Sequence, residues 1–452
     1  MSDVTPSIHA HSIRDNPHQT PLATPITVSL NAVDNDPVVK LVYSLLIDAV
    51  RLGASDLHFE PYEHVYRVRF RIDGVLKQMA ILDLQLIPQV SARLKIMAQM
   101  DISERRLPQD GRITLKTADN NTLSYRASAL PTLFGEKIVL RVIDAAESLA
   151  GIDDLGLEPD QKQTFLKALH QPQGIVLITG PTGSGKTLSL YTGLGLLNTD
   201  STNISTVEDP VEITLTGINQ VSVNPKIGLS FDTALKSFLR QDPDVVMVGE
   251  IRDLETADTA IRAAQTGHLV LSTLHTNSAA ETLTRLHHMG IASFNIATAI
   301  SLVVAQRLAR RLCEHCKKRA DFPKLSLLQM GFLETDFKPS PISQSDPNQS
   351  GLGQSMPKQP LVEQLDSSST ASTIYEAVGC EHCIEGYKGR VGIFEVMSIT
   401  DELAELIMQG GNALQIKALA EQQGFYSLRR AAISKVLQGT ISIREMNRIT
   451  VT

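Results

Sequence analysis

Residues 180–187 read GPTGSGKT, a short segment in which glycines surround a lysine and a threonine. The glycines let the backbone turn so that successive N–H groups point inward at phosphate oxygens. Lys186 would place a cation on the β- and γ-phosphates, and the Thr187 hydroxyl would be a ligand for Mg²⁺. A Gly-rich structural turn is the alternative. The predicted nucleotide site comprises Gly180, Pro181, Thr182, Gly183, Ser184, Gly185, Lys186 and Thr187.

Polar residues follow three further strand-like segments. One apolar run ends in Gly249-Glu250, which predicts a variant Walker B carboxylate that holds Mg²⁺ through its waters. Another ends in Glu208 and Asp209, and Glu208 is the better candidate to polarise the attacking water because it comes first after the strand. A third ends near His275, where an imidazole could report on the γ-phosphate. Each residue taken alone could be a strand-end cap, whereas together beside a nucleotide loop they favour catalysis.

Arginines that could stabilise a transition state occur in two places before the nucleotide loop. One group alternates along a strand-like segment, and strand side chains that alternate share one face. The other lies in SERRLPQDGR, on a predicted loop. The alternatives are a solvated basic face and arginine fingers that reach a γ-phosphate, within the chain or across a subunit boundary. The candidates are Arg67, Arg69, Arg71, Arg105, Arg106 and Arg112.

The chain has only four cysteines, and they form two copies of the tetrapeptide CEHC. Two Cys-x-x-Cys turns supply the four thiolates that a closed tetrahedral Zn²⁺ site requires. The long spacing between the pairs adds closure entropy only slowly, about 0.6 kcal/mol per doubling of the loop. Redox use of either pair and unpaired buried thiols are the alternatives. We predict a structural zinc bound by Cys313, Cys316, Cys380 and Cys383.

The elements before the nucleotide loop predict a tail and a small domain. Residues 1–36 are rich in Pro, Ser, Thr, His and Asn and are expected to be disordered. A helix should begin at Asp36-Pro37, because Asp is a good N-cap and Pro fits the first helical position. Alternating segments around the hairpin signal Asp73-Gly74 follow. We therefore expect an α/β domain over 37–150.

The remainder should position the nucleotide loop and the cysteines. From 151 to 312, buried strands alternate with helices, which is typical of a doubly wound, mostly parallel sheet. GIVLIT before the loop and TLSLYTGLGLL after it predict a strand and a helix. A zinc-binding subdomain is expected over 313–395, with a flexible Pro/Ser/Gln-rich insert at 334–372. A helical region at 396–452 completes the chain.

The composition excludes some classes of protein. Of 452 residues, 42% are hydrophobic and 20% charged, as in ordinary globular proteins. A formal net charge of −7 and 4% aromatics argue against nucleic-acid binding. No apolar run approaches the ~18 residues that cross a bilayer, and the N-terminus lacks a basic-then-apolar signal. We expect a cytoplasmic protein without a transmembrane segment.

In combination, the motifs resemble those of the secretion-superfamily ATPases of type II secretion and type IV pili. LGASDLHFEP, RRLPQDGR, GPTGSGKT, TVEDPVE, LRQDPDVVMVGEIRDLETA and TGHLVLSTLHTN carry the resemblance, over about 37–452. AAETLTRLHHMGIASFNIATAISLVVAQRLARRLC is most similar to the pilus-extension branch. The resemblance implies a RecA-like core, a PAS-like N-terminal domain, ATP with Mg²⁺, and a homohexameric ring with nucleotide between the two subdomains of each protomer.

The resemblance also implies roles for particular residues. Glu208 and Asp209 belong to the family's Asp box, Glu250 is its Walker B glutamate, and His268 and His275 belong to its His box. Arginines of the N-terminal domain approach the phosphates in the family. A tetracysteine subdomain is common in assembly and secretion ATPases and missing from retraction ATPases, which favours an assembly motor here.

The biological role implied is a motor that adds pilin subunits at the inner membrane. It would work with an inner-membrane pilus platform protein and a cytoplasmic pilus accessory protein, associated with the membrane through these partners. A type II secretion ATPase is the closest alternative; a nucleic-acid translocase and a non-hydrolysing scaffold are more distant ones. Extension ATPases commonly carry a further docking domain, whereas only a short tail precedes residue 37, so their usual docking mode is not implied. The insert is also longer than the family suggests.

Overall fold

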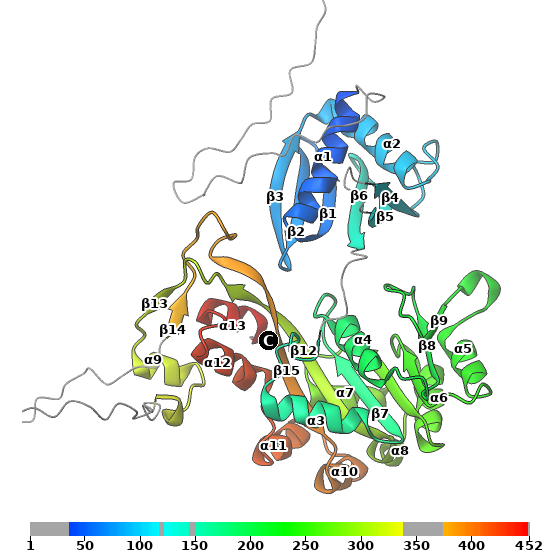
Figure 1. Ribbon diagram of the computed structural model, residues 1–452, viewed down its shortest axis with the longest axis vertical. Helices are drawn as coiled ribbons and strands as arrows, with labels where there is room; N and C mark the ends of the chain where they lie inside the picture. Colours follow the sequence, from blue (N-terminus) through cyan, green and yellow to red (C-terminus); the bar gives the residue numbers. More distant parts are fainter. Residues whose placement is uncertain (1–35, 117–121, 144–150, 338–373, 451–452) are drawn as a thin grey trace, which may run out of the picture.

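The structure, a computed structural model, describes residues 36–116, 122–143, 151–337 and 374–450 (Figure 1). The expected tail lies outside these ranges except for Asp36. The expected insert also lies outside them except for Glu334–Phe337, which forms the short 3-10 helix η3. Each helix within the described ranges is too short or too polar to cross a lipid bilayer.

The N-terminal domain is a six-stranded antiparallel sheet with helices α1 and α2 packed on its apolar face. The strand order is β3-β2-β1-β6-β5-β4. This confirms the small α/β domain predicted from the alternating segments. Its elements are α1 (Pro37–Arg51), β1 (Ala54–Pro61), β2 (Tyr66–Ile72), β3 (Val75–Leu82), η1 (Leu84–Leu86), α2 (Ile87–Met97), β4 (Gln109–Lys116), β5 (Thr122–Thr132) and β6 (Gly135–Ile143).

Local signals place the first elements of this domain. The Asp36 carboxylate accepts a hydrogen bond of 2.8 Å from the N–H of Val38, and Pro37 is the first helical residue of α1. In β2, alternate residues are buried, which leaves its arginines on the opposite face. Asp73 and Gly74 have φ angles of 48° and 81°. Two positive φ angles are what a tight two-residue hairpin turn requires.

The second unit is built on a seven-stranded sheet with the order β15-β12-β7-β11-β10-β8-β9. Neighbouring strands from β12 to β9 run parallel, and only β15 pairs antiparallel, with β12. The predicted doubly wound, mostly parallel sheet is confirmed. Its strands are β7 (Gly174–Thr179), β8 (Ile204–Glu208), β9 (Asn219–Ser222), β10 (Val245–Val248), β11 (Leu269–Leu274), β12 (Ile300–Leu312) and β15 (Tyr387–Ser398).

Helices cover both faces of this sheet, so all six residues of β7 are buried. Ile175 and Leu177 pack with the helices of one face, and Val176 and Ile178 pack with those of the other. On the second face lie α3 (Pro159–Leu169) and α4 (Lys186–Leu197). On the first lie α5 (Phe231–Phe238), α6 (Leu254–Gln265), α7 (Ala279–His288), α8 (Ser293–Ala299), α10 (Asp401–Met408) and α11 (Ala413–Gln422).

β12 and β15 are long and leave the core sheet together toward the cysteines (Figure 1). β15 therefore belongs to the core sheet as well, although it lies mostly inside the range expected to form the zinc subdomain. A buried ion pair of 3.0 Å between Arg310 of β12 and Glu445 fastens this extension to the last helix. The remaining elements are β13 (Lys318–Ala320), α9 (Lys324–Gln329), β14 (Ile374–Glu376), α12 (Leu428–Leu437) and α13 (Ile443–Thr450).

Glu60 is a buried carboxylate that draws together the cations of the N-terminal sheet. It is 2% exposed and accepts hydrogen bonds of 2.7 and 2.9 Å from Arg69. Lys137 lies 3.2 Å away and Arg67 3.4 Å away. Burial by itself would raise the pKa of Glu60, but the hydrogen bonds from Arg69 and Lys137 outweigh it and lower that pKa from 4.5 to about 2.

We expect Glu60→Gln to make the stability of the N-terminal domain less dependent on pH. The folded-state pKa lies below the unfolded-state value, so the carboxylate stabilises the fold above about pH 4.5 and loses this effect as the pH falls toward 2. At pH 7 the variant should lose about 3 kcal/mol of unfolding free energy, and the gap to wild type should narrow by pH 3. Urea unfolding of the full chain, followed by far-UV circular dichroism, measures both.

The matched control is Glu63→Gln, because the Glu63 side chain is 67% exposed. This control should follow wild type at each pH. A constant gap between Glu60→Gln and wild type from pH 7 to pH 3 would show that the Glu60 charge does not carry the effect.

Candidate functional site

The loop 180–187 joins β7 to α4 at the carboxyl edge of the parallel sheet. At Gly180, a Cβ atom would lie 2.5 Å from the carbonyl oxygen of Gln306, so only glycine fits. Gly185 is the N-cap of α4 with a φ of 85°, a left-handed conformation that also favours glycine. The first turn of α4 offers N–H groups and the positive end of its dipole to the same place. This is the geometry of an anion-binding loop.

Lys186 is a buried cation held by neutral oxygens. Its Nζ donates to the carbonyls of Gly180 at 2.8 Å and Pro181 at 3.2 Å. Burial lowers the pKa of the Lys186 ammonium below its usual value; the negative charge of Glu250 opposes this and the positive charge of Arg307 adds to it. Carbonyls do not neutralise the charge, so an anionic phosphate would be a better partner.

Three of the predicted residues meet at the ends of β8, β10 and β11. The carboxylate of Glu250 accepts a hydrogen bond from Arg252, and Arg252 Nη1 also lies 3.4 Å from Asp209 Oδ2. His275 Nε2 lies 3.4 Å from Glu250 Oε2. We call Asp209, Glu250, Arg252 and His275 the β10 cluster. β7, β11, β10 and β8 are neighbouring parallel strands, so the β10 cluster lies at the same edge of the sheet as the nucleotide loop, and Glu250 acts on the charge of Lys186.

Glu208 lies on the α4 side of the sheet. It is 4% exposed and accepts hydrogen bonds from Thr206 Oγ1 at 2.6 Å and from the Tyr191 hydroxyl of α4. Burial, and then the Glu208 carboxylate, raise the pKa of Tyr191, so its phenol stays a neutral donor. Asp209 lies just beyond the end of β8, and it rather than Glu208 contacts Arg252 of the β10 cluster.

The structure does not bring His268 to the β10 cluster. His268 precedes β11, and its Nδ1 lies 2.9 Å from the carbonyl oxygen of Ala263. Its own carbonyl accepts a hydrogen bond of 3.2 Å from Gly174, the first residue of β7. The nucleotide loop and His275 follow the other ends of these two strands. The six residues of β11, at about 3.3 Å each, separate the two histidines.

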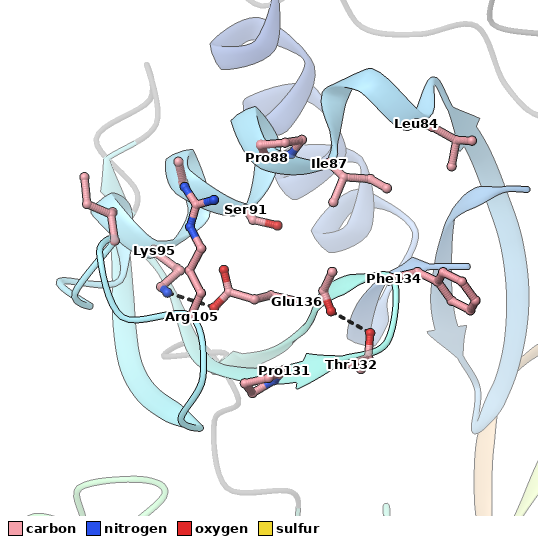
Figure 2. Close-up of a pocket in the computed structure, with 13 residues that line it drawn as sticks. Leu84, Ile87, Pro88, Ser91, Lys95, Arg105, Pro131, Thr132, Phe134 and Glu136 are labelled. Atoms are coloured by element: carbon pink, nitrogen blue, oxygen red, sulfur yellow. Dashed lines mark hydrogen bonds and ion pairs between the residues drawn. The ribbon is translucent and has the colours of Figure 1, made fainter. Parts of the chain in front are cut away.

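The partners described for the candidate arginines lie within the N-terminal domain. Arg67 and Arg69 contact Glu60, Arg71 contacts Asp56 at 3.4 Å, and Arg106 contacts Glu104 at 2.9 Å. Arg105 lines a pocket of about 380 Å³ between α2 and the β5–β6 hairpin, where Lys95 and Glu136 form a buried ion pair of 2.8 Å (Figure 2).

Arg112 is exposed on β4 and extends the basic face of the sheet. It lies opposite Arg126 on β5, which lies opposite Arg141 on β6. Arg141 in turn is 3.1 Å from Asp56. Arg126 and Arg141 were not among the predicted residues. The alternation of polar and apolar residues along their strands is the signal that could have identified them.

Arg252 and Arg307 are further site residues that the sequence analysis missed. Arg252 stands two residues after Glu250 in the GEIRD segment, so its proximity could have been inferred from spacing. Arg307 lies on β12, a strand distant in sequence from both the loop and the β10 cluster. No local pattern indicates its place.

The two CEHC turns converge at the far end of the β12–β15 extension. The Sγ atoms are 3.8 Å apart for Cys313 and Cys380, 3.7 Å for Cys316 and Cys383, and 3.6 Å for Cys380 and Cys383. All four lie within 4.8 Å of one another. Disulfides need a separation of about 2.05 Å, whereas a tetrahedral site with metal–sulfur bonds of about 2.3 Å needs sulfurs about 3.8 Å apart. The four thiols therefore fit a single metal ion.

Backbone N–H groups also support the sulfurs. Gly379 donates to Cys316 Sγ and Cys380 donates to Cys383 Sγ, both at 3.3 Å. Such bonds favour thiolates, as metal ligation requires. Without a metal, burial raises the pKa of Cys383 to about 12, so metal binding must release protons.

The loop, the strand ends and the doubly wound sheet define an ATPase of the RecA-like P-loop class. The family model described as "Type II/IV secretion system protein" matches residues 31–448. The chain belongs to this family of secretion ATPases.

Curated relatives carry names from both branches of the family. The chain is 59% identical to "Type IV pilus assembly ATPase PilB" of Acinetobacter baylyi, over 92% of this chain and 67% of that relative. It is 54% identical to the protein of the same name in Pseudomonas aeruginosa, over 92% of this chain and 68% of the relative. It is 40% identical to "Type II secretion system ATPase E" of Vibrio cholerae, over 93% of this chain and 77% of the relative.

Solved structures agree on the fold. A pilus retraction motor, PilT with bound ADP, has a TM-score of 0.55 at 22% identity, over 91% of this chain and 97% of that one. The Legionella pneumophila ATPase DotB has a TM-score of 0.61 at 20% identity, over 94% of this chain and 99% of that one. At 20–22% identity, these matches show that the fold is shared and nothing beyond the fold.

We expect Glu250→Gln to lower turnover strongly and to preserve nucleotide binding. The amide keeps the shape of the side chain but removes the negative charge beside Lys186, and loss of such a group typically costs about 10²–10⁴-fold in rate. ATPase rates and equilibrium binding of a fluorescent ATP analogue to the full chain measure the two effects separately.

Glu255→Gln is the control, because Glu255 is an exposed acid in the first turn of α6. It should keep the wild-type rate. Turnover by Glu250→Gln at more than half of the wild-type rate would exclude a catalytic carboxylate at this position.

Proposed function

We propose that this chain is the ATP-hydrolysing motor of type IV pilus assembly, acting as a homohexameric ring on the cytoplasmic side of the inner membrane. The observation that carries the proposal is the 59% identity to a pilus assembly ATPase over 92% of this chain. A nucleotide loop, a carboxylate cluster beside it and four convergent thiols support the same assignment.

In the proposed reaction, the backbone N–H groups of 180–187 hold the phosphates and Lys186 neutralises their charge. Thr187 and Glu250 would hold Mg²⁺, which when bound shields the phosphate charge. His275, beside Glu250, would respond to the terminal phosphoryl group. Glu208 remains the candidate to polarise the attacking water, and to do so it must release the Tyr191 hydroxyl or another of its present partners.

The N-terminal arginines would complete the charge stabilisation. Arg67, Arg69 and Arg71 are tied to carboxylates, whereas Arg112 is exposed. A change in the position of the domain relative to a nucleotide, within the chain or across a subunit boundary, would bring such side chains to the phosphates. Substituting the six candidate arginines one at a time would identify the side chain that reaches the phosphates.

The metal proposed for the cysteine cluster is zinc, because Zn²⁺ prefers four sulfur ligands in tetrahedral geometry. When bound it would lock the ends of β12 and β15 together, a structural role. The proposed partners are an inner-membrane platform protein and a cytoplasmic pilus accessory protein, which would attach the motor peripherally to the membrane.

A type II secretion ATPase is the second candidate. This chain is 40% identical to the Vibrio cholerae secretion ATPase over 93% of this chain. A secretion motor would use the same nucleotide chemistry. The identity to pilus assembly ATPases is higher, 54% and 59%, and favours the pilus.

We expect a strain that lacks the gene to lose surface pili and to regain them with the wild-type protein but not with Lys186→Ala. The substitution removes the buried cation of the nucleotide loop. Electron microscopy and sheared-pilin blots measure piliation. A deletion strain that stays piliated and instead stops secreting proteins would favour type II secretion.

We expect the purified chain to contain about one zinc ion, and Cys313→Ser/Cys380→Ser to contain almost none. Elemental mass spectrometry measures the metal content. His315→Ala and His382→Ala are matched controls, because both histidines stand within the CEHC turns and should be dispensable if four sulfurs fill the shell. Zinc lost from either histidine variant would exclude a purely four-sulfur site.

A further inference from the structure

Arg307 is a buried cation without a carboxylate partner within the described part of the chain. It is 9% exposed. Its Nη1 donates to the carbonyl of Gln306 at 3.1 Å, and its Nη2 donates to Asn277, at 2.9 Å to the carbonyl and 3.2 Å to the side-chain oxygen. All these acceptors are neutral. Glu395 and Glu281 act on the charge of Arg307 without a direct ion pair, and burial outweighs them and lowers its pKa. Burial of a cation whose direct contacts are all neutral costs free energy.

The register of the sheet puts Arg307 alongside the nucleotide loop. β12 runs parallel to β7 with Ala305 opposite Thr179, so the residues after Ala305 continue beside the start of the loop. The Gln306 carbonyl that accepts from Arg307 is the atom that lies 2.5 Å from a Cβ built at Gly180. The guanidinium thus lies between the nucleotide loop and the segment after β11 that contains Asn277.

Two buried cations, Lys186 and Arg307, therefore lie beside the same loop. The positive charge of Arg307 contributes to lowering the pKa of Lys186, while burial also lowers the pKa of Arg307. Glu250 is the anion that acts on Lys186. Glu395 and Glu281 act on Arg307. A polyphosphate would supply a direct anionic partner to both side chains.

Asn277, the residue that holds Arg307, lies close in sequence to the β10 cluster. Asn277 follows His275, which contacts Glu250 in the β10 cluster, the place where the terminal phosphoryl group would react. The N–H of Asn277 also donates to Glu281 of α7 at 3.0 Å. If Arg307 released Asn277, the hydrogen bond from Asn277 to Glu281 would transmit the change to the start of α7.

We propose that Arg307 is a phosphate-sensing residue that leaves Asn277 and binds an oxygen of the γ-phosphate of a nucleotide on the same chain. This role rests on the nucleotide site proposed above and is separate from the arginines of the N-terminal domain. Arginine suits it because its planar guanidinium can bind two oxygens at once and remains charged when buried. ADP lacks the γ-phosphate, so Arg307 would distinguish ATP from ADP.

The test compares the binding of a non-hydrolysable ATP analogue and of ADP, each with Mg²⁺, to the full chain by isothermal titration calorimetry. Arg307→Gln should weaken the analogue about 10- to 100-fold, the size expected for a charged hydrogen bond, and change ADP affinity less than about threefold. Arg307→Lys should restore part of the loss. The matched control Arg311→Gln, at an exposed arginine of the same strand, should behave as wild type.

A second variant leaves the arginine in place. Asn277→Ala removes the side-chain acceptor that competes for Arg307, so the preference for the ATP analogue over ADP should rise about two- to fivefold. A fall in this preference would overturn the proposal even if Arg307→Gln did not fold, which thermal unfolding reports.

The remaining outcomes separate this proposal from the nucleotide site itself. Equal weakening of the analogue and ADP by Arg307→Gln would assign Arg307 a structural role, and unchanged affinity for both would remove it from the site. Lys186→Ala should weaken both nucleotides. Wild-type protein that binds neither nucleotide would overturn the nucleotide site and the Arg307 proposal together.

Discussion

The parallel pairing of β12 with β7 is the constraint on which the nucleotide site depends. It places the Gln306 carbonyl so close to Gly180 that a Cβ there would lie at 2.5 Å, and the Gln306 side-chain amide 2.9 Å from a Cβ at Gly185. Gln306 also accepts a hydrogen bond of 2.9 Å from Ser189 in the first turn of α4. One strand thus packs against both ends of the loop. The backbone contact requires glycine at Gly180, and the left-handed φ of 85° favours glycine at Gly185.

Charge is distributed in opposite ways in the two units. In the N-terminal domain, one buried carboxylate, Glu60, collects several cations and is well compensated. In the ATPase core, the buried cations Lys186 and Arg307 contact neutral oxygens, and the carboxylates gather in the β10 cluster beside them. The first arrangement stabilises a fold. The second keeps positive charge available for a ligand, because the direct contacts of both cations in the described part of the chain are with neutral oxygens.

β12 also connects the proposed nucleotide site to the cysteine cluster. Its middle carries Arg307, and its last residue, Leu312, directly precedes Cys313. Between them, Arg310 forms the buried ion pair with Glu445. The cysteines lie at the end of β12 and in the segment before β15, which returns along β12 into the core sheet. A metal at the cysteines would therefore hold the far end of the strand that frames the loop.

The sequence by itself determined the features that depend on neighbouring residues. The nucleotide loop, the capped start of α1, the Asp73-Gly74 turn and the two Cys-x-x-Cys turns are local, since each depends on backbone preferences or spacing within a few residues. The alternation of buried strands and helices likewise indicated the doubly wound sheet, because a strand covered on both faces has a continuous run of apolar residues.

Only the tertiary structure decided which strand ends meet and which way their side chains point. It joined Asp209 rather than Glu208 to the β10 cluster, left His268 at the opposite edge, added β15 to the core sheet and brought Arg307 to the loop. These outcomes depend on strand order and register, which arise from contacts between residues far apart in the chain. A local sequence pattern therefore cannot predict strand order or register.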